Sequence, residues 1–255
     1  DMMVIDLVDQ YLYRVPNAKT KLNLLVYLLR IHEEYSRVLI FARTRETAEN
    51  IHKYLNRMEI GEWKAIHANK GQNTRLNAYE EFSEGKIRGI VATDVAARGI
   101  DVSEVSHVIN FDAPVMYTDY VHRVGRTGRA EKEGVAITFA SEVEHYHIRK
   151  IEELIGQEIK LLKIPKEVEL LDTSYDEKQA FAREIDRQKR KEDPTYQGAF
   201  HDRKKAALKN PNKANHKTIQ AYKFIAEEGD KHKNKGKGKG KSKHKGPTIK
   251  RKGKR

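Results

Sequence analysis

IRGIVATDVAARGID, residues 87–101, is the stretch that decides the fold class. It begins as a strand-like run and changes character at Thr93 and Asp94, where the strand is expected to end. A Thr-Asp pair after a strand either faces a ligand from a backbone turn or caps a helix, and the pair alone does not separate the two roles. Gly99 permits a tight turn or a close backbone approach. The Asp101 carboxylate just beyond it is suited to accept a hydrogen bond from a hydroxyl.

Outward from this stretch, short apolar runs alternate with segments of helical periodicity. Strands are expected at 37–42, 63–68, 87–93, 107–112 and 134–140, and helices around 22–29 and at 44–58, 72–83 and 118–124. Several strands are apolar on both faces, which is typical of parallel strands covered on two sides. The β-α-β-α order predicts an α/β fold with a doubly wound, mostly parallel sheet and right-handed crossovers. Ligands of such sheets bind beyond the carboxyl ends of the strands.

Composition excludes several classes of site. The chain has 255 residues and no cysteine, so disulfide scaffolds, thiolate zinc sites and cysteine nucleophiles are ruled out. The longest strongly apolar run, residues 22–29, is too short to span a bilayer, and no secretory signal opens the chain. The lack of cysteine is compatible with a reducing cytosolic setting, and the expected location is cytoplasmic, with no membrane partner. The chain starts at Asp1 and is strand-like by residue 7, so we expect a fragment of a larger protein, with ordinary processing or a cloning remnant as the alternative.

The positive charge is concentrated at the C-terminal end. The formal net charge is +13, and residues 231–255 hold thirteen Lys or Arg and no Asp or Glu, which leaves 37 basic and 37 acidic residues in 1–230. A basic tail on a balanced body is typical of nucleic-acid binding. The tail has almost nothing to bury and repels itself, so it is predicted to be disordered. Between a domain over 1–165 and this tail, residues 166–230 are expected to form a helical to weakly structured extension.

A second stretch, HRVGRTGRA at 122–130, places three arginines three residues apart. Arg123, Arg126 and Arg129 form either a solvated basic turn or a phosphate-binding site, because guanidinium groups bind phosphate with two parallel hydrogen bonds. Gly125 and Gly128 make a straight helix through the motif unfavourable, so the later arginines are expected on a turn. The motif alone does not choose between the two.

Four elements in order resemble the DEAD-box RNA helicases. ATDVAARGID and HRVGRTGRA are similar to their motifs V and VI, VLIFART at 38–44 to their motif IV, and Gln72 with Arg75 to their Q-x-x-R element. The resemblance covers roughly residues 5–165 and implies the second RecA-like domain of that family. The stretch HANKGQNTR, together with the extension and the basic tail, is most similar to the bacterial RhlE-type branch.

The resemblance implies an ATP site built from motifs V and VI. In the family the last two arginines of motif VI, here Arg126 and Arg129, reach the γ-phosphate, and the histidine, here His122, links to the first domain. The end of motif V, here Gly99 and Asp101, faces the nucleotide ribose. The implied cofactor is ATP, with its Mg²⁺ held by the absent first domain and no metal site in this chain.

The resemblance also implies an RNA site. The motif V threonine and the Q-x-x-R pair, here Thr93, Gln72 and Arg75, hold the RNA sugar–phosphate backbone, and Thr44 of motif IV is a further candidate. Many family members have glycine after the histidine that precedes this element, whereas this chain has Ala68, which puts a close backbone contact to RNA there in doubt.

Two functions follow as expectations. The chain contains neither a G-x-x-x-x-G-K-[ST] phosphate loop nor a DEAD sequence, so alone it is expected to be inactive toward ATP. The first expectation is the C-terminal half of an ATP-dependent RNA helicase, whose partners are RNA, the missing N-terminal RecA-like domain and ribonucleoprotein or ribosomal particles. The alternative is a non-enzymatic RNA-binding or annealing module that acts through its tail.

Overall fold

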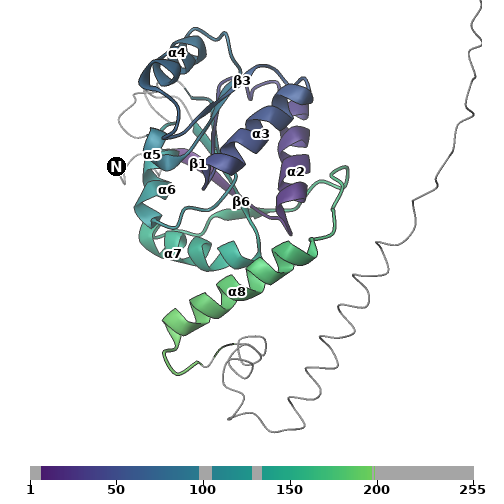
Figure 1. The fold of residues 1–255 in the computed structure, drawn as a ribbon, viewed down its shortest axis with the longest axis vertical. Coiled ribbons are helices and arrows are strands. Elements are labelled where there is room, and N and C mark those ends of the chain that lie inside the picture. The colour runs from purple at the N-terminus through teal and green to yellow at the C-terminus, as the bar shows by residue number, and fades with distance from the viewer. Residues whose placement is uncertain (1–6, 98–104, 128–133, 197, 199–255) are drawn as a thin grey trace, which may run out of the picture. The chain divides into compact units, whose positions relative to one another are not determined.

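A seven-stranded sheet forms the centre of the fold in the computed structural model, which describes residues 7–97, 105–127, 134–196 and 198 (Figure 1). The strands lie in the order β3-β4-β2-β5-β6-β1-β7, and every pairing is parallel. Their bounds are β1 (Val8–Arg14), β2 (Val38–Phe41), β3 (Trp63–Ile66), β4 (Gly89–Ala92), β5 (His107–Asn110), β6 (Gly134–Ala140) and β7 (Lys160–Leu162). The predicted parallel α/β sheet is confirmed, and β7, only three residues long, is a strand that periodicity did not reveal.

Helices cover both faces of the sheet, as a doubly wound fold requires. One face packs against α2 (Ala18–Ile31) and α3 (Arg45–Arg57). The other packs against α4 (Gln72–Ser83), α5 (Asp94–Ala97), α6 (Tyr117–Val124) and α7 (His145–Ile155) (Figure 1). None of the helices in the described part of the chain combines the length and the apolar character needed to cross a bilayer.

Strand β2 shows why the apolar runs do not alternate with polar residues. Val38 and Ile40 point into the core under α2 and α3, whereas Leu39 and Phe41 point into the core on the opposite face. All four residues are buried because successive side chains of a strand face opposite sides and both sides are covered here.

The parallel arrangement brings the carboxyl ends of the strands to one edge of the sheet. Backbone hydrogen bonds carry the pairing to the last strand residues, with Ala42 N donating to Ala92 O at 2.9 Å and Phe111 N to Phe41 O at 2.9 Å. The loops that leave β2, β4 and β5 therefore start side by side. Motif IV runs from β2 into the first of these loops, and motif V begins at the last residue of β4.

The extension helix α8 (Tyr175–Glu192) lies against the domain rather than projecting from it (Figure 1). The Ala18 amide at the start of α2 donates to Glu177 Oε1 at 3.0 Å, and Gln188 Nε2 donates to Val143 O at 2.9 Å. The segment before α8 follows α2, where Leu171 N donates to Thr20 Oγ1 at 3.1 Å. The helical part of the extension expected over 166–230 is confirmed by α8, while the boundary at 165 stays a prediction.

Beyond α8 the chain forms a second unit, Asp193–Arg255, of which residues 193–196 and 198 are described. In that short piece Thr195 N donates to Asp193 Oδ1 at 2.9 Å. The predicted disordered tail, 231–255, lies outside the described residues.

A buried histidine makes the stability of the fold sensitive to mild acid. The ring of His107 stacks on Tyr35 with centroids 3.7 Å apart, and desolvation lowers the pKa of His107 to about 4. The unfolded chain binds this proton near pH 6.5 and the folded chain only near pH 4, so stability falls as pH decreases through this window. We expect a loss of about 2 kcal/mol in the free energy of unfolding between pH 7 and pH 5 from this residue.

Urea denaturation at the two pH values measures this loss, and His107→Phe is the informative variant because it keeps a stacking ring without a titrating group. The variant should lose less stability between pH 7 and pH 5 than the parent chain. An equal loss in both proteins would show that His107 is not responsible.

Candidate functional site

Arg123, the first arginine of the motif VI stretch, is a structural residue. Its side chain is 2 % exposed, and its guanidinium makes a two-pronged bond to Asp94, with Nε to Oδ1 at 2.6 Å and Nη2 to Oδ2 at 2.8 Å. Of the three evenly spaced arginines, this one is therefore directed inward. Arg123 belongs to motif VI and Asp94 to motif V, so this ion pair joins the two motifs.

The third guanidinium nitrogen of Arg123, Nη1, binds the end of β5 and the loop that follows it. Nη1 donates to Asp112 O at 2.8 Å and to Asn110 Oδ1 at 3.2 Å, and the guanidinium lies 5.0 Å from the centre of the Phe41 ring. A guanidinium has five N–H donors in a fixed fork, which lets one side chain join groups from several segments. The ends of β2, β4 and β5 are thereby held together around Arg123.

Arg126 lies on a turn that is flanked by two buried residues, Arg123 and Thr127. Helix α6 ends at Gly125, and Arg126 follows as a half-buried residue. The next residue, Thr127, is buried and donates its hydroxyl to Val105 O at 2.7 Å. The turn predicted from the glycines is confirmed over residues 125–127, and the buried residues Arg123 and Thr127 hold Arg126 where it lines a pocket with Asp94 and Ala97.

A small pocket joins this turn to motif V. It is lined by Phe41, Asp94, Ala97, Asp119, His122, Arg123 and Arg126. His122 is exposed on α6 and borders the pocket beside Arg126. The structure therefore brings together two of the predicted ATP-site residues, and the other three, Gly99, Asp101 and Arg129, lie outside the described residues.

The predicted RNA residues of α4 and motif V form a second group. Gln72 opens α4, and Arg75 donates through Nη1 to Gln72 Oε1 at 3.3 Å and through Nη2 to Ala96 O at 2.9 Å. Thr93 follows β4 directly, and its amide donates to Ile66 O at 3.1 Å. Gln72, Arg75 and Thr93 thus lie on adjoining segments, because Arg75 ties α4 to the helix that starts beside Thr93.

The two groups of predicted residues meet at Tyr79. Its hydroxyl donates to Ala96 O at 3.4 Å. Burial raises the pKa of Tyr79 to about 12, and the positive charges of Arg75 and Arg126 oppose that increase. Arg75 from the predicted RNA site and Arg126 from the predicted ATP site therefore both lie close enough to Tyr79 to influence its pKa.

Within the described part of the chain Thr44, the fourth predicted RNA residue, makes no hydrogen bond to Gln72, Arg75 or Thr93 and instead caps a helix. It is the N-cap of α3, where Oγ1 accepts from the Thr47 amide at 3.1 Å. Its side chain is exposed in the loop that leaves β2. A capping threonine satisfies a free amide at a helix start, so this position is explained locally and its role toward RNA stays a prediction.

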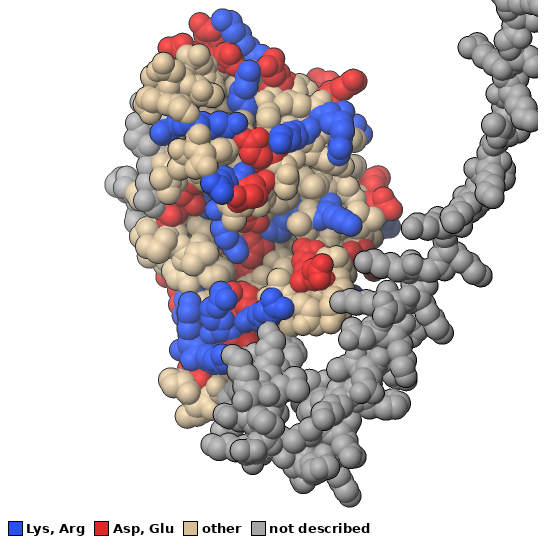
Figure 2. Space-filling view, viewed as in Figure 1, with Lys and Arg blue, Asp and Glu red and all other residues tan. Residues whose placement is uncertain are grey.

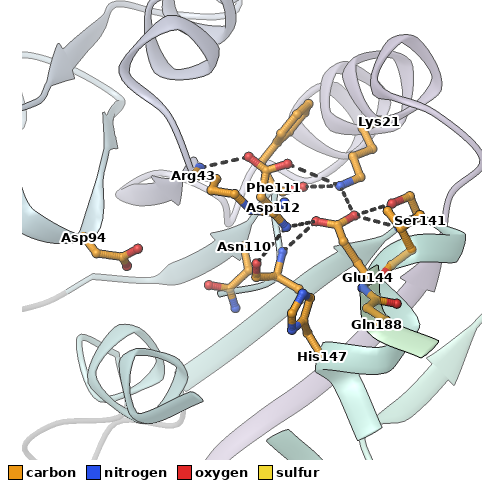
Figure 3. A network of polar contacts seen from close by, with 12 residues as sticks. Lys21, Arg43, Asp94, Asn110, Phe111, Asp112, Ser141, Glu144, His147 and Gln188 are labelled. Atoms are coloured by element: carbon orange, nitrogen blue, oxygen red, sulfur yellow. Dashed lines mark hydrogen bonds and ion pairs between the residues drawn. The ribbon is translucent and has the colours of Figure 1, made fainter. Parts of the chain in front are cut away.

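Sequence reasoning missed a buried charge network at the same edge of the sheet (Figure 3). Glu144 accepts from Lys21 Nζ at 2.7 Å and from Arg43 Nη2 at 3.0 Å, and Asp112 Oδ2 accepts from the Arg43 amide at 2.9 Å. The sequence feature that could have indicated this network is that Arg43, Asp112 and Glu144 each follow the end of a strand. The loops of a parallel sheet converge there.

The surface carries no single charge sign. Figure 2 shows acidic and basic side chains interspersed over the face drawn, with basic side chains gathered over the C-terminal part of α8. The last turn of that helix contains Lys189, Arg190 and Lys191.

Sequence comparisons match this chain to helicases. Residues 20–131 match the family described as the helicase conserved C-terminal domain. A span of 155 residues is 43% identical to the ATP-dependent RNA helicase RhlB of Pseudomonas syringae pv. tomato, and it covers 60% of this chain and 38% of that protein. The chain thus spans well under half the length of this curated relative.

Two solved structures show the same fold. The E. coli DEAD-box protein SrmB, solved bound to the regulator of ribonuclease activity A, is 35% identical with a TM-score of 0.60 over 66% of this chain and 96% of that one. S. cerevisiae Dbp5, solved bound to RNA and ADP BeF3, is 26% identical with a TM-score of 0.57 over 71% of this chain and 45% of that one.

Proposed function

The chain belongs to the DEAD-box RNA helicase family, and from that premise we propose that it is the C-terminal half of an ATP-dependent RNA helicase. It would supply one wall of the nucleotide site and one part of the RNA site, while an upstream RecA-like domain supplies the phosphate loop and the Mg²⁺ ligands. A cytoplasmic location and ribonucleoprotein or ribosomal particles as partners belong to the same proposal, as does assignment to the RhlE-type branch.

The observation that carries the proposal is the fixed turn that presents Arg126. Arg123 and Thr127 are buried on either side of it, so the Arg126 side chain starts from a rigid base beside the pocket that it lines with Asp94 and Ala97. A guanidinium stabilises the charge that develops on a transferring phosphoryl group only if it is already in place, because reorganisation would cost part of the gain. A rigid base supports that role.

In the proposed mechanism, ATP and RNA bring the two domains together. Arg126 and Arg129 then approach the γ-phosphate of ATP and neutralise charge on it, as arginine fingers do in other nucleotide hydrolases. His122, exposed on the adjoining turn of α6, would face the upstream domain, and Gly99 with Asp101 would hold the ribose. ATP supplies the free energy, while this chain contributes cations, shape and exclusion of water.

RNA would be held by its backbone. Gln72 and Thr93 present an amide and a hydroxyl, and Arg75, tied to Gln72 and to Ala96, adds a positioned cation. Contacts of this kind fix the strand without reading its bases, so weak sequence preference is expected. Closure would bend the bound strand and separate short duplexes locally.

The test is RNA-stimulated ATP hydrolysis by the protein that includes the upstream domain. Turnover should rise when single-stranded RNA is added and short duplexes should separate in the same conditions, whereas the 255-residue chain alone should do neither. Hydrolysis by the isolated chain, or turnover of the two-domain protein that RNA does not change, would contradict the proposal.

The charge of the tail favours a second candidate function. Thirteen cations in residues 231–255 support an RNA-binding or annealing module that works without ATP, and the two functions coexist if the tail tethers RNA for the helicase. Each phosphate neutralised on a single strand contributes about −0.7 to the slope of log K against log salt concentration. Deleting 231–255 should therefore make that slope shallower by several units.

Fluorescence anisotropy of a labelled single-stranded RNA across a salt series measures this slope. A deletion of 199–230 that leaves the tail attached controls for chain length. An unchanged slope after loss of 231–255 would rule out the tail as the main RNA contact.

A further inference from the structure

The buried charge network links the loop that carries Thr44, a predicted RNA residue, to the extension helix α8 (Figure 3). Its acidic centre is Glu144, the last residue of the short 3-10 helix η1 (Glu142–Glu144), with a side chain 4 % exposed. The other charged members are Lys21 on α2, Arg43 after β2 and Asp112 after β5. With two cations and two carboxylates the cluster is formally neutral, which indicates an internal arrangement rather than a site for an added ion.

Each Glu144 oxygen has a distinct set of donors. Oε1 accepts from Arg43 Nη2 and from the Ala113 amide, each at 3.0 Å. Oε2 accepts from Lys21 Nζ at 2.7 Å and from Ser141, whose amide and hydroxyl lie at 2.8 Å and 2.7 Å. Burial disfavours the carboxylate, but the charges of Lys21 and Arg43 and these hydrogen bonds outweigh it and hold the pKa of Glu144 below its usual range.

The donors on Oε1 belong to the loops that leave β2 and β5. Arg43 precedes Thr44, and its own amide is held by Asp112 Oδ2 at 2.9 Å, while its Nη2 also donates to Ala113 O at 3.2 Å. Asp112 in turn accepts from Arg123 through its carbonyl oxygen at 2.8 Å. The Glu144 carboxylate therefore binds both the side chain of Arg43 and the backbone of the loop after β5, and that loop also contacts the arginine that joins motifs V and VI.

The extension helix contacts the same place from the other side. Gln188 is buried, and its Nε2 donates at 2.9 Å to the carbonyl oxygen of Val143, the residue directly before Glu144. This hydrogen bond restrains η1 from α8. Glu177 adds a second attachment of α8 at the start of α2, three residues before Lys21.

We propose that Glu144 is a positioning residue for the RNA-facing loop at Arg43–Thr44, and that docking of α8 through Gln188 keeps Glu144 in place. The proposal rests on the proposed function, since it gives the loop its role toward RNA. A purely structural ion pair would stabilise the whole domain evenly, whereas a positioning residue acts first on the loops it holds.

Amide hydrogen exchange of the 255-residue chain, resolved residue by residue, separates these two roles. In Glu144→Gln the amides of Arg43 and Ala113 should exchange at least about tenfold faster, because their loops lose a charged acceptor. Glu153→Gln, which removes an exposed carboxylate from α7, is the matched control, and Ile155→Val in the core of α7 controls for general destabilisation. Equal acceleration of all sheet amides would overturn the proposal.

Gln188→Ala tests the same idea without touching the charges, so it remains informative if Glu144→Gln does not fold. It should accelerate exchange at Arg43 and Ala113 in the same direction by a smaller factor. Acceleration confined to α8 would overturn the part of the proposal that concerns the extension.

RNA affinity separates this inference from the proposed function. Glu144→Gln should weaken binding of a single-stranded RNA by about three- to tenfold at fixed salt, and the tail is common to all variants. If Arg75→Ala weakens binding and Glu144→Gln does not, the positioning role is wrong and the RNA site stands. If neither variant changes the affinity, the proposed RNA site itself is wrong.

Discussion

Replacing Arg126 with alanine in the two-domain protein is expected to lower RNA-stimulated ATP hydrolysis by about 10³-fold or more. A positioned arginine contributes most when phosphoryl charge develops, so kcat should fall while the apparent affinity for ATP changes little. The same substitution at Arg129 should have a comparable effect, because the family resemblance gives both residues the same role. Steady-state turnover at saturating RNA, over a range of ATP concentrations, measures both quantities.

An exposed arginine remote from the turn provides the control for loss of the charge. Arg183→Ala on the exposed side of α8 removes the same charge and should leave turnover within about twofold. Arg126→Ala should change the free energy of unfolding by no more than about 1 kcal/mol, since the residue is only half-buried. Turnover within a few-fold of the parent after either substitution in motif VI would show that the arginine in question is not a finger.

Replacing Arg123 with alanine is expected to lower the free energy of unfolding, whereas the main effect of replacing Arg126 is on turnover. The substitution leaves the Asp94 carboxylate without its two donors at 2.6 and 2.8 Å and removes the bonds to Asn110 and Asp112. Breaking one partner of a buried pair costs about 3–5 kcal/mol, and the lower end applies here because Asp94 is 24 % exposed and regains water. Urea denaturation of the 255-residue chain measures the loss.

The Arg123→Lys variant separates the contribution of the two parallel hydrogen bonds from that of the positive charge. A lysine keeps the positive charge and cannot make the two parallel bonds to Asp94, so it should recover only a minor part of the lost stability. Comparison with Arg126→Ala, three residues further along, supplies the control in the same motif. Equal losses of stability from the two alanine variants would mean that the buried geometry of Arg123 contributes nothing special.

The sheet and its connections were predictable because they depend on local pattern. Apolar runs such as 37–42 required helices on both faces, and the alternating order of strands and helices left a doubly wound parallel sheet as the consistent arrangement. The same rule placed motifs IV and V at one edge of the sheet, since parallel strands end together. Gly125 marked the end of α6 for an equally local reason, because glycine is unfavourable inside a helix.

The roles of the arginines were not predictable from spacing. Arg123 and Arg126 are the same residue type three positions apart, yet one is 2 % exposed and bound to Asp94 while the other borders a pocket. The difference comes from the end of α6: Arg123 is still on the helix face that packs on the sheet, and Arg126 lies beyond Gly125, where the chain turns away. No pattern within the motif records which face of α6 is buried.

The sequence by itself determined the parallel α/β fold class, the alternation of most strands and helices along the chain, and the family, because those depend on hydrophobic period, turn residues and short motifs that neighbours along the chain already define. Tertiary structure alone decided which buried polar and charged groups became partners. Lys21 and Glu144 are 123 positions apart and Val143 and Gln188 are 45 apart, and each pair meets only because strands and helices from distant segments end at the same edge. A charge buried there must find a partner in the assembled fold, since leaving it unpaired costs several kcal/mol, about the stability of a small domain.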